Sequence, residues 1–352
     1  MKQLRSTVIR AGLEALYFSG AHHLLRPIFA GVGAIFMLHH VRPRDGREFQ
    51  PNHHLEVEPS FLRAVLSHLR AHGIEIVSMD EVHRRLSEKD FKRRFAAFTL
   101  DDGYRDNRDH ALPVMREFDA PCTVYAVSDF AAGTGRLWWV ALERAVASAS
   151  AIEVEIRGRM TRMETGTAAQ KQAAFDRLHD WLRALPSEQD VLNEIAKLCA
   201  RHGVDESAIC RELCMSWEEL KAFAGDPLVT IGAHTVTHPN LAKQSEETAL
   251  NELKTSRARI EAALGRPVRH LAYPYGDRLA AGPREFALAK AAGFKTAVTT
   301  RPGMTFPESA GYLTALQRVS LNGNYQDERI LPVLTSGAAT AMWNGFRRID
   351  AA

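Results

Sequence analysis

The feature that most constrains the fold is a short apolar run that ends on two adjacent carboxylates. Residues Phe95–Leu100 are apolar and rich in strand formers, which is typical of a buried strand in a parallel sheet. Asp101, Asp102 and Gly103 follow directly. Desolvating an unpaired carboxylate is costly, so this strand end needs a compensating charge. A divalent metal ion would supply it, and a simple Asp-Gly turn is the alternative interpretation.

A second run favours the metal interpretation. The β-branched stretch Val229–Ala233 leads into His234 and His238, which are four residues apart. On a continuous strand their Cα atoms would lie roughly 13 Å apart, whereas zinc binds nitrogens at about 2.0–2.1 Å. We therefore expect the strand to end near His234 and the chain to turn before Pro239. The spacing is weak evidence alone, but together with the two carboxylates it predicts a metal site.

These residues resemble a known enzyme family. Thr99–Gly103 (Thr-Leu-Asp-Asp-Gly) and His234–His238 (His-Thr-Val-Thr-His) resemble the first two motifs of the polysaccharide deacetylases, which include the nodulation chitooligosaccharide deacetylases. Ala272–Gly276 (Ala-Tyr-Pro-Tyr-Gly) looks like the third motif, which normally begins with Arg. The resemblance covers roughly residues 34–130 and 226–323. It implies an α/β fold, a distorted (β/α) barrel.

The resemblance also implies a site. By its motifs, Asp102, His234 and His238 bind the metal, and Asp101 is the general base. Two histidines and one carboxylate with open positions suit a catalytic Zn²⁺ ion, so the implied cofactor is a divalent metal, with zinc favoured. The metal polarises water while the adjacent carboxylate accepts its proton. Tyr275 matches the residue whose backbone N–H stabilises the oxyanion.

Hydrolysis of an amide also requires an acid that protonates the leaving amine. The family's usual Leu-x-His motif is missing, and Gln317–Leu321 occupies that region. Met37–Val41 (Met-Leu-His-His-Val) instead resembles the Tyr-His-x-Val strand of the permuted branch, typified by poly-N-acetylglucosamine deacetylases. That resemblance assigns the acid role to His39, whose usual pKa range suits an acid near neutral pH. His40 should point the other way. The alternative is a pair of strand-end histidines bonded to backbone.

Two departures from the family pattern concern positive charge and substrate contact. Ala272 replaces the third-motif Arg that restrains the catalytic Asp in relatives, and the fourth-motif Trp is missing near Ala297–Thr300. Arg301 and Arg318 are candidates for the missing charge and for substrate binding, and a surface or ion-pair role is the alternative for both. These differences leave the choice of substrate open.

The rest of the chain predicts one barrel with an insertion. Alternating strand and helix patterns assign residues 34–335 to the barrel. Residues 133–227 break this rhythm and predict a mainly helical insertion, in which Trp138-Trp139 could stack on sugar rings or fill a core. Residues 336–352 are predicted to be a loose C-terminal tail, and residues 1–33 an amphipathic segment.

The amphipathic segment and the composition bear on location. Apolar residues recur at helical spacing between Leu13 and Ile28, so this helix either packs on the barrel or makes peripheral membrane contact through residues 1–30. We expect no signal peptide or membrane span. Four cysteines, taken as reduced thiols, favour the cytoplasm, and a net charge of +3 is too small to indicate nucleic acid binding.

Together these observations predict a metal-dependent hydrolase that removes N-acetyl groups from the amino sugars of a glycan. The glycan's length and linkage, and the oligomeric state, have no signal in the sequence. One alternative is a deacylase or deformylase of a lipid-linked or small sugar. An alternative of another class is a catalytically silent glycan-binding barrel. The four metal-site and base residues argue against silence, because a binding module needs no base beside a metal.

Overall fold

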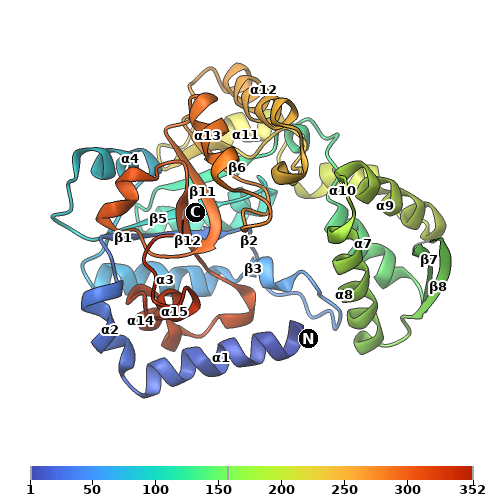
Figure 1. Cartoon of the computed structure of the whole chain (residues 1–352), viewed down its shortest axis with the longest axis horizontal. Helices are drawn as coiled ribbons and strands as arrows, with labels where there is room; N and C mark the ends of the chain where they lie inside the picture. Colours follow the sequence, from blue (N-terminus) through green and yellow to red (C-terminus); the bar gives the residue numbers. More distant parts are fainter. Residues whose placement is uncertain (1, 157, 351–352) are drawn as a thin grey trace.

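A closed barrel of seven parallel strands forms the centre of the computed structural model, which describes residues 2–156 and 158–350 (Figure 1). The ring closes because β5 pairs with β1 along the whole length of both strands. In ring order the strands are β1 (Gly33–Leu38), β12 (Leu316–Ser320), β11 (Thr296–Pro302), β10 (His270–Ala272), β9 (Val229–Ala233), β6 (Cys122–Ala126) and β5 (Phe95–Leu100). The predicted (β/α) barrel is confirmed. A short strand, β4 (Glu75–Ile76), adds to the start of β5.

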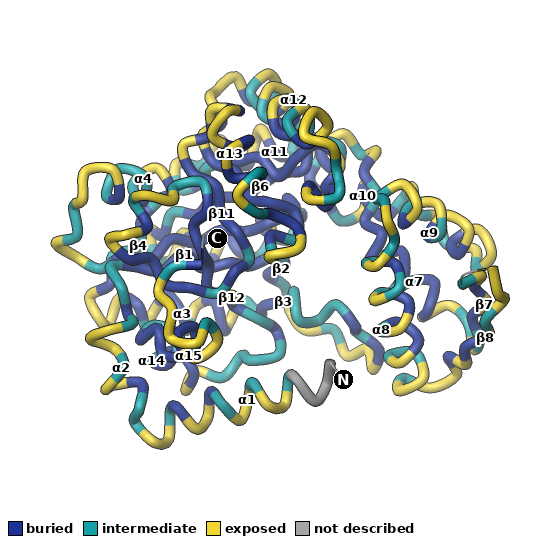
Figure 2. Tube along the Cα trace, viewed as in Figure 1, coloured by how far each residue is buried: buried dark blue, intermediate teal, exposed yellow. Residues whose placement is uncertain are grey.

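Helices cover the outside of the barrel, so that both faces of its strands are buried. Every residue of β1, β5 and β6 is buried, as expected for strands between a barrel interior and a helical layer (Figure 2). The covering helices are α3 (Pro59–Ala71), α4 (Met79–Glu88), α5 (Leu112–Glu117), α11 (Trp217–Phe223), α12 (Glu246–Leu264) and α13 (Pro283–Ala291). Ser78, Ser216 and Ser245 cap the starts of α4, α11 and α12 by accepting a backbone N–H of the first turn.

Several boundaries differ from those predicted. The first strand ends at Leu38, and His40–Val41 forms a separate strand, β2, that pairs with β3 (Glu56–Val57). Strand β11 runs on to Pro302, and its pairing with β12 shifts register. The chain after β5 is helical from Arg105, as the strand–helix alternation predicts, and contains a π-helical turn at Asn107–Ala111. Shorter segments are α6 (Ser128–Ala131) and the 3₁₀ turns His53–Leu55, Leu241–Lys243, Pro307–Gly311, Gly323–Tyr325 and Glu328–Ile330.

The predicted insertion is a small helical unit with its own core, seen in green beside the barrel in Figure 1. Its elements are α7 (Trp138–Ser148), the hairpin β7 (Ala151–Ile156) and β8 (Arg159–Glu164), α8 (Ala168–Ala184), α9 (Glu188–His202) and α10 (Glu206–Leu213). The core of this unit extends to Cys214, whereas Met215 and the buried side chains of α11 belong to the barrel core. Residues 215–227 of the predicted insertion thus pack with the barrel through Met215, Leu220 and Phe223.

The two ends of the chain pack together. The N-terminal segment forms α1 (Lys2–Phe18) and α2 (Ala21–Phe29), and the C-terminal segment forms α14 (Leu331–Thr335) and α15 (Ala338–Trp343), which contacts both. The segment expected to be a loose tail is thus packed, and Asp350 is buried. Among the described residues, no helix has the length and apolar content needed to cross a bilayer.

Candidate active site

Six of the eight predicted site residues line one cavity of about 280 Å³ at the carboxyl ends of the barrel strands, and Arg301 and Arg318 do not line it. The carboxyl ends of parallel strands lie at the same end of a barrel, so residues far apart in sequence converge there. Asp101 and Asp102 follow β5, and His234 follows β9. The insertion contributes Trp138 and Trp139 to the cavity wall. Both indoles are also buried in the insertion core, as one of the two roles considered for them predicts.

Asp102, His234 and His238 form a compact buried cluster. The Oδ1 atom of Asp102 lies 3.5 Å from Nε2 of each histidine. Left-handed backbone, which non-glycine residues rarely adopt, is concentrated here. Of seven such non-glycine residues in the described chain, four lie at this site: Asp102, Thr235, His238 and Tyr275. Strain of this kind persists where the surrounding structure enforces it, commonly at functional sites.

The cluster fits a divalent metal ion. The Oδ1 atom of Asp102 is buried and has no hydrogen-bond partner. Burial, with the neighbouring Asp101 carboxylate as the second cause, raises the pKa of Asp102 to about 8, so its anion needs a cation nearby. His234 donates Nδ1–H to the Ala272 carbonyl over 2.7 Å, which leaves the lone pair of Nε2 facing Asp102. A carboxylate and two neutral imidazoles are a donor set that suits Zn²⁺.

Asp101 is held by Arg318 in a buried bidentate ion pair. The Nη1 and Nη2 atoms of Arg318 donate to the two carboxylate oxygens of Asp101 over 2.8 and 2.7 Å. Burial alone would raise the pKa of Asp101, but the guanidinium outweighs it and holds this pKa well below the usual range. The remaining bonds of Arg318 go to Thr99 and the Thr299 carbonyl. Arg318 therefore positions Asp101 and is too enclosed to contact a substrate.

His39 and His40 lie on opposite sides of the chain. His39 lines the cavity, and its Nε2 lies 3.9 Å from Oδ2 of Asp101. His40 bonds through Nδ1 to Asp106 over 2.6 Å and stacks on Tyr104. Burial lowers the pKa of His39 to about 3 against the opposing charge of Asp101. The sequence predicted a pKa near neutrality for His39, and its surroundings lower that pKa instead.

Tyr275 links the barrel to the insertion. Its hydroxyl accepts a hydrogen bond from Nε1 of Trp138 over 2.8 Å, and the guanidinium of Arg183 lies 4.2 Å from its ring centroid. Among the described residues, the backbone N–H of Tyr275 has no protein acceptor.

Arg301 is not brought to the site. Its guanidinium is buried on Asp350 and on the Ala281 carbonyl, and it stacks on Phe286. The substrate-binding role predicted for Arg301 has no support in this position, because the side chain is enclosed by the C-terminal segment.

Sequence reasoning missed several residues of the cavity wall. These are Asn52 and His54 from the loop before β3, His179 and Arg183 from α8, and Asp277 and Thr300 from the barrel rim. Arg183 donates to Asp277 over 3.0 Å, so the insertion is tied to the rim. The only sequence signal was the four-residue spacing of His179 and Arg183 on one helical face, which many solvent-exposed helices share.

The first comparison concerns sequence families. A profile described as "Polysaccharide deacetylase" matches residues 88–297, more than half of the chain. The chain belongs to the polysaccharide deacetylase family. A comparison with curated proteins gave no match. The family resemblance of the motifs is thus confirmed independently of the site geometry.

The second comparison concerns solved structures. The deacetylase PplD of Streptococcus pyogenes, solved with acetate, aligns with a TM-score of 0.54 at 18% identity over 83% of this chain and 92% of that chain. IcaB from Ammonifex degensii aligns with a TM-score of 0.53 at 15% identity over 86% and 97%. The polysaccharide deacetylase BC0361 of Bacillus cereus gives 0.53 at 18% over 86% and 68%. At these identities the likeness supports the fold.

Proposed function

We propose that this family member is a metal-dependent N-deacetylase that releases acetate from N-acetylated amino sugars of a glycan. The observation that carries the proposal is the convergence of Asp101 with the buried cluster of Asp102, His234 and His238 in one cavity. Two of the structures with the same fold, PplD and BC0361, are named as deacetylases. A base beside a metal-binding cluster has no use in a protein that only binds glycans.

Asp102, His234 and His238 would hold the metal, with zinc as the favoured ion. A divalent ion bound there would act as a Lewis acid and would lower the pKa of a water molecule bound to it. His234 is oriented for this by its bond to the Ala272 carbonyl, and loss of such an outer contact usually weakens metal binding about 10–100-fold.

Asp101 would accept a proton from the attacking water. Arg318 holds both of its oxygens, so the carboxylate is ionised and fixed in orientation. The amide carbonyl oxygen of the substrate becomes an oxyanion in the same step, and the Tyr275 N–H would donate to it. Both groups belong to the chain and need no rearrangement to act.

His39 would deliver the proton to the leaving amine. Because burial keeps His39 neutral near pH 7, it must gain this proton during the reaction. The carboxyl of Asp101, 3.9 Å from its Nε2, is the nearest source. The chain thus offers a path from Oδ2 of Asp101 through Nε2 of His39 to the amine nitrogen.

The experiment that tests this function is an assay of acetate release by the purified chain with zinc. Substrates would be β-1,4- and β-1,6-linked N-acetylglucosamine oligomers and the monosaccharide. We expect acetate from at least one oligomer and none after chelation. Formate release from an N-formyl sugar, without acetate from any substrate, would favour the deformylase alternative. Glycan binding without either product would identify a silent barrel.

Arg318→Met tests the positioning of Asp101. The variant leaves a buried carboxylate without its partner, which should lower the free energy of unfolding at pH 7 by about 3–5 kcal/mol. Burial then raises the pKa of Asp101, so the loss of stability persists above that pKa and shrinks as the pH falls through it. The acidic limb of the kcat/KM profile should move to higher pH.

Arg301→Met is the matched control, because Arg301 is also buried and ion-paired. It should lower stability without moving the acidic limb. Urea unfolding at two pH values and the pH–rate profile are the measurements. An unshifted limb in Arg318→Met would contradict the positioning role.

His39→Ala and His40→Ala test the general acid. We expect His39→Ala to lower kcat by roughly 10²–10⁴ with its metal content unchanged. His40→Ala should mainly lower stability, because it removes the contacts with Asp106 and Tyr104. Steady-state kinetics and metal analysis separate the two. If only His40→Ala stops turnover, the predicted register is off by one residue.

A further inference from the structure

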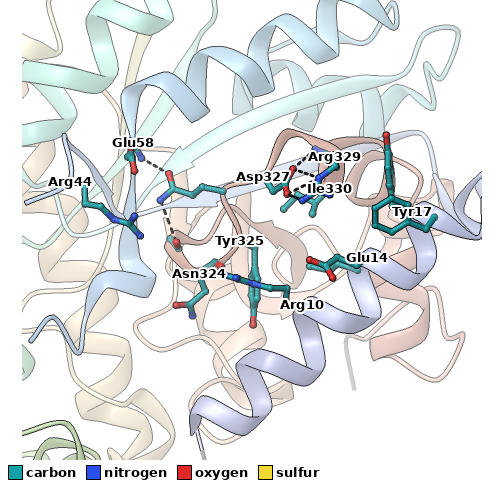
Figure 3. Close-up of a pocket in the computed structure, with 14 residues that line it drawn as sticks. Arg10, Glu14, Tyr17, Arg44, Glu58, Asn324, Tyr325, Asp327, Arg329 and Ile330 are labelled. Atoms are coloured by element: carbon teal, nitrogen blue, oxygen red, sulfur yellow. Dashed lines mark hydrogen bonds and ion pairs between the residues drawn. The ribbon is translucent and has the colours of Figure 1, made fainter. Parts of the chain in front are cut away.

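One side of helix α1 holds it to the barrel, and the opposite side is free. Figure 3 shows Arg10 on α1 beside Asn324 and Tyr325. The Nη2 atom of Arg10 donates to the Asn324 carbonyl over 2.7 Å. Leu13 and Leu16 are buried on the same side. The side of α1 turned away from these contacts is therefore the side that meets solvent.

Exposed apolar side chains gather on this free side and on the elements next to it. Ten large apolar side chains are exposed in the described residues, and seven of them lie on α1, α2 and residues 342–346. We call these seven the terminal apolar face: Val8, Phe18, Leu24, Ile28, Met342, Trp343 and Phe346. Helices α1, α2 and α15 contact one another, and the rings of Phe29 and Phe346 lie 5.7 Å apart. Such a concentration marks an interaction surface.

A pocket of unbalanced positive charge adjoins this face. Arg26, Arg94 and Arg348 line it together with Ile28, and the described residues of its wall include no acid. Arg348 lies 3.8 Å from one acid outside this wall, Glu308, which is about half exposed. The Nε atom of Arg94 is buried without a hydrogen-bond partner.

A second pocket, beside α1, is different, although Phe18 of the terminal apolar face also lines it. There Arg10, Arg44 and Arg329 are balanced by three carboxylates, those of Glu14, Glu58 and Asp327 (Figure 3). Of these two pockets, the one lined by Ile28 is therefore the one with an excess of positive charge.

We propose that the terminal apolar face, with Arg26 and Arg348, docks the protein on a membrane surface that contains anionic lipids. Apolar side chains would enter the boundary between headgroups and acyl chains, and Arg26 and Arg348 would bind lipid phosphates. Arg94 would add positive charge from behind, because its Nη2 already donates to the Ala30 and Thr335 carbonyls. A second copy of the chain fits less well, because a symmetric contact would bring two arginine clusters together. The sequence suggested membrane contact through residues 1–30, and the structure adds the C-terminal segment to that surface.

Cosedimentation of the full chain with vesicles tests the proposal. We expect binding to mixed phosphatidylcholine–phosphatidylglycerol vesicles, weaker binding at high salt, and little binding to phosphatidylcholine alone. Leu24→Ser combined with Ile28→Ser should abolish binding. The matched control is Leu279→Ser, since Leu24 and Leu279 are both 80% exposed and Leu279 lies outside the face.

A second pair of variants tests the charges. Arg26→Gln with Arg348→Gln should weaken vesicle binding about fivefold per arginine removed. Arg159→Gln with Arg162→Gln, two exposed positions on β8, should not. Acetate release from a soluble oligomer should be unchanged in all these variants, so failure of docking and failure of the proposed enzyme are distinguishable.

Three results would overturn the proposal. The first is equal binding to neutral and anionic vesicles, or none to either. The second is binding of inorganic phosphate at the arginines without recruitment to vesicles, which would indicate a soluble ligand. The third is a dimer in solution that Leu24→Ser with Ile28→Ser dissociates, which would assign the face to a second copy.

Discussion

Replacing both His234 and His238 by alanine is expected to abolish turnover and to weaken metal binding by more than about 100-fold. The two imidazoles face the unpartnered Oδ1 of Asp102 from 3.5 Å, and their removal leaves one of the three proposed ligands. Metal content after dialysis and acetate release are the measurements. Stability without metal should change little or increase, because the variant no longer buries ligands that lack their ion.

The matched control is His270→Ala. His270 is as buried as the two ligands but bonds to Thr296 and lies against Asp80, away from the cluster. Its variant should keep its metal and its turnover, provided that circular dichroism shows it folded. Full metal retention in the double variant would place the metal elsewhere.

Asp101→Asn is expected to lower kcat by roughly 10²–10⁴ while metal stays bound. The amide has the shape of the carboxylate but cannot accept a proton from water. It also leaves Arg318 as a buried cation without its counter-charge, so the free energy of unfolding should fall as well. Single-turnover acetate release at saturating substrate measures the chemical step and excludes an effect on binding alone.

Asp106→Asn is the control for this variant. Asp106 is close in sequence and pairs with His40, but it does not line the cavity. Turnover should remain near that of the unmodified protein. Near-normal turnover of metal-loaded Asp101→Asn would mean that another group is the base. It would also contradict the proposed proton transfer from Asp101 to His39.

The pattern of apolar and polar residues along the sequence predicted two of the site-bearing strands and where they end. The apolar run before Asp101 is strand β5, and the β-branched run before His234 is β9. Both end where the sequence said they would, because polar ligands cannot continue a buried strand. Alternation of side chains also separated His39 from His40, which the structure places on opposite sides.

Long-range pairing decided what the sequence left open. Arg301 and Arg318 were equivalent candidates for one missing charge, since both stand near strand ends. The register shift between β11 and β12 and the closed ring direct Arg318 to Asp101, while the packed C-terminal segment takes Arg301. Which arginine pairs with Asp101 depends on which distant strands become neighbours. Residue type and spacing along the chain do not indicate those neighbours.

The sequence alone determined which residues carry the family motifs and where they stand along the chain: two carboxylates, two histidines and the third-motif tyrosine, near the ends of predicted strands. Those motifs were enough to predict the family and the barrel. The tertiary structure decided the rest. It set the low pKa of His39 by burial, made α8 a wall of the cavity, and packed the helices of the two terminal segments against one another. Strand formation and ligand identity follow from neighbouring residues, whereas burial, electrostatic environment and surface continuity exist only once remote segments are packed together.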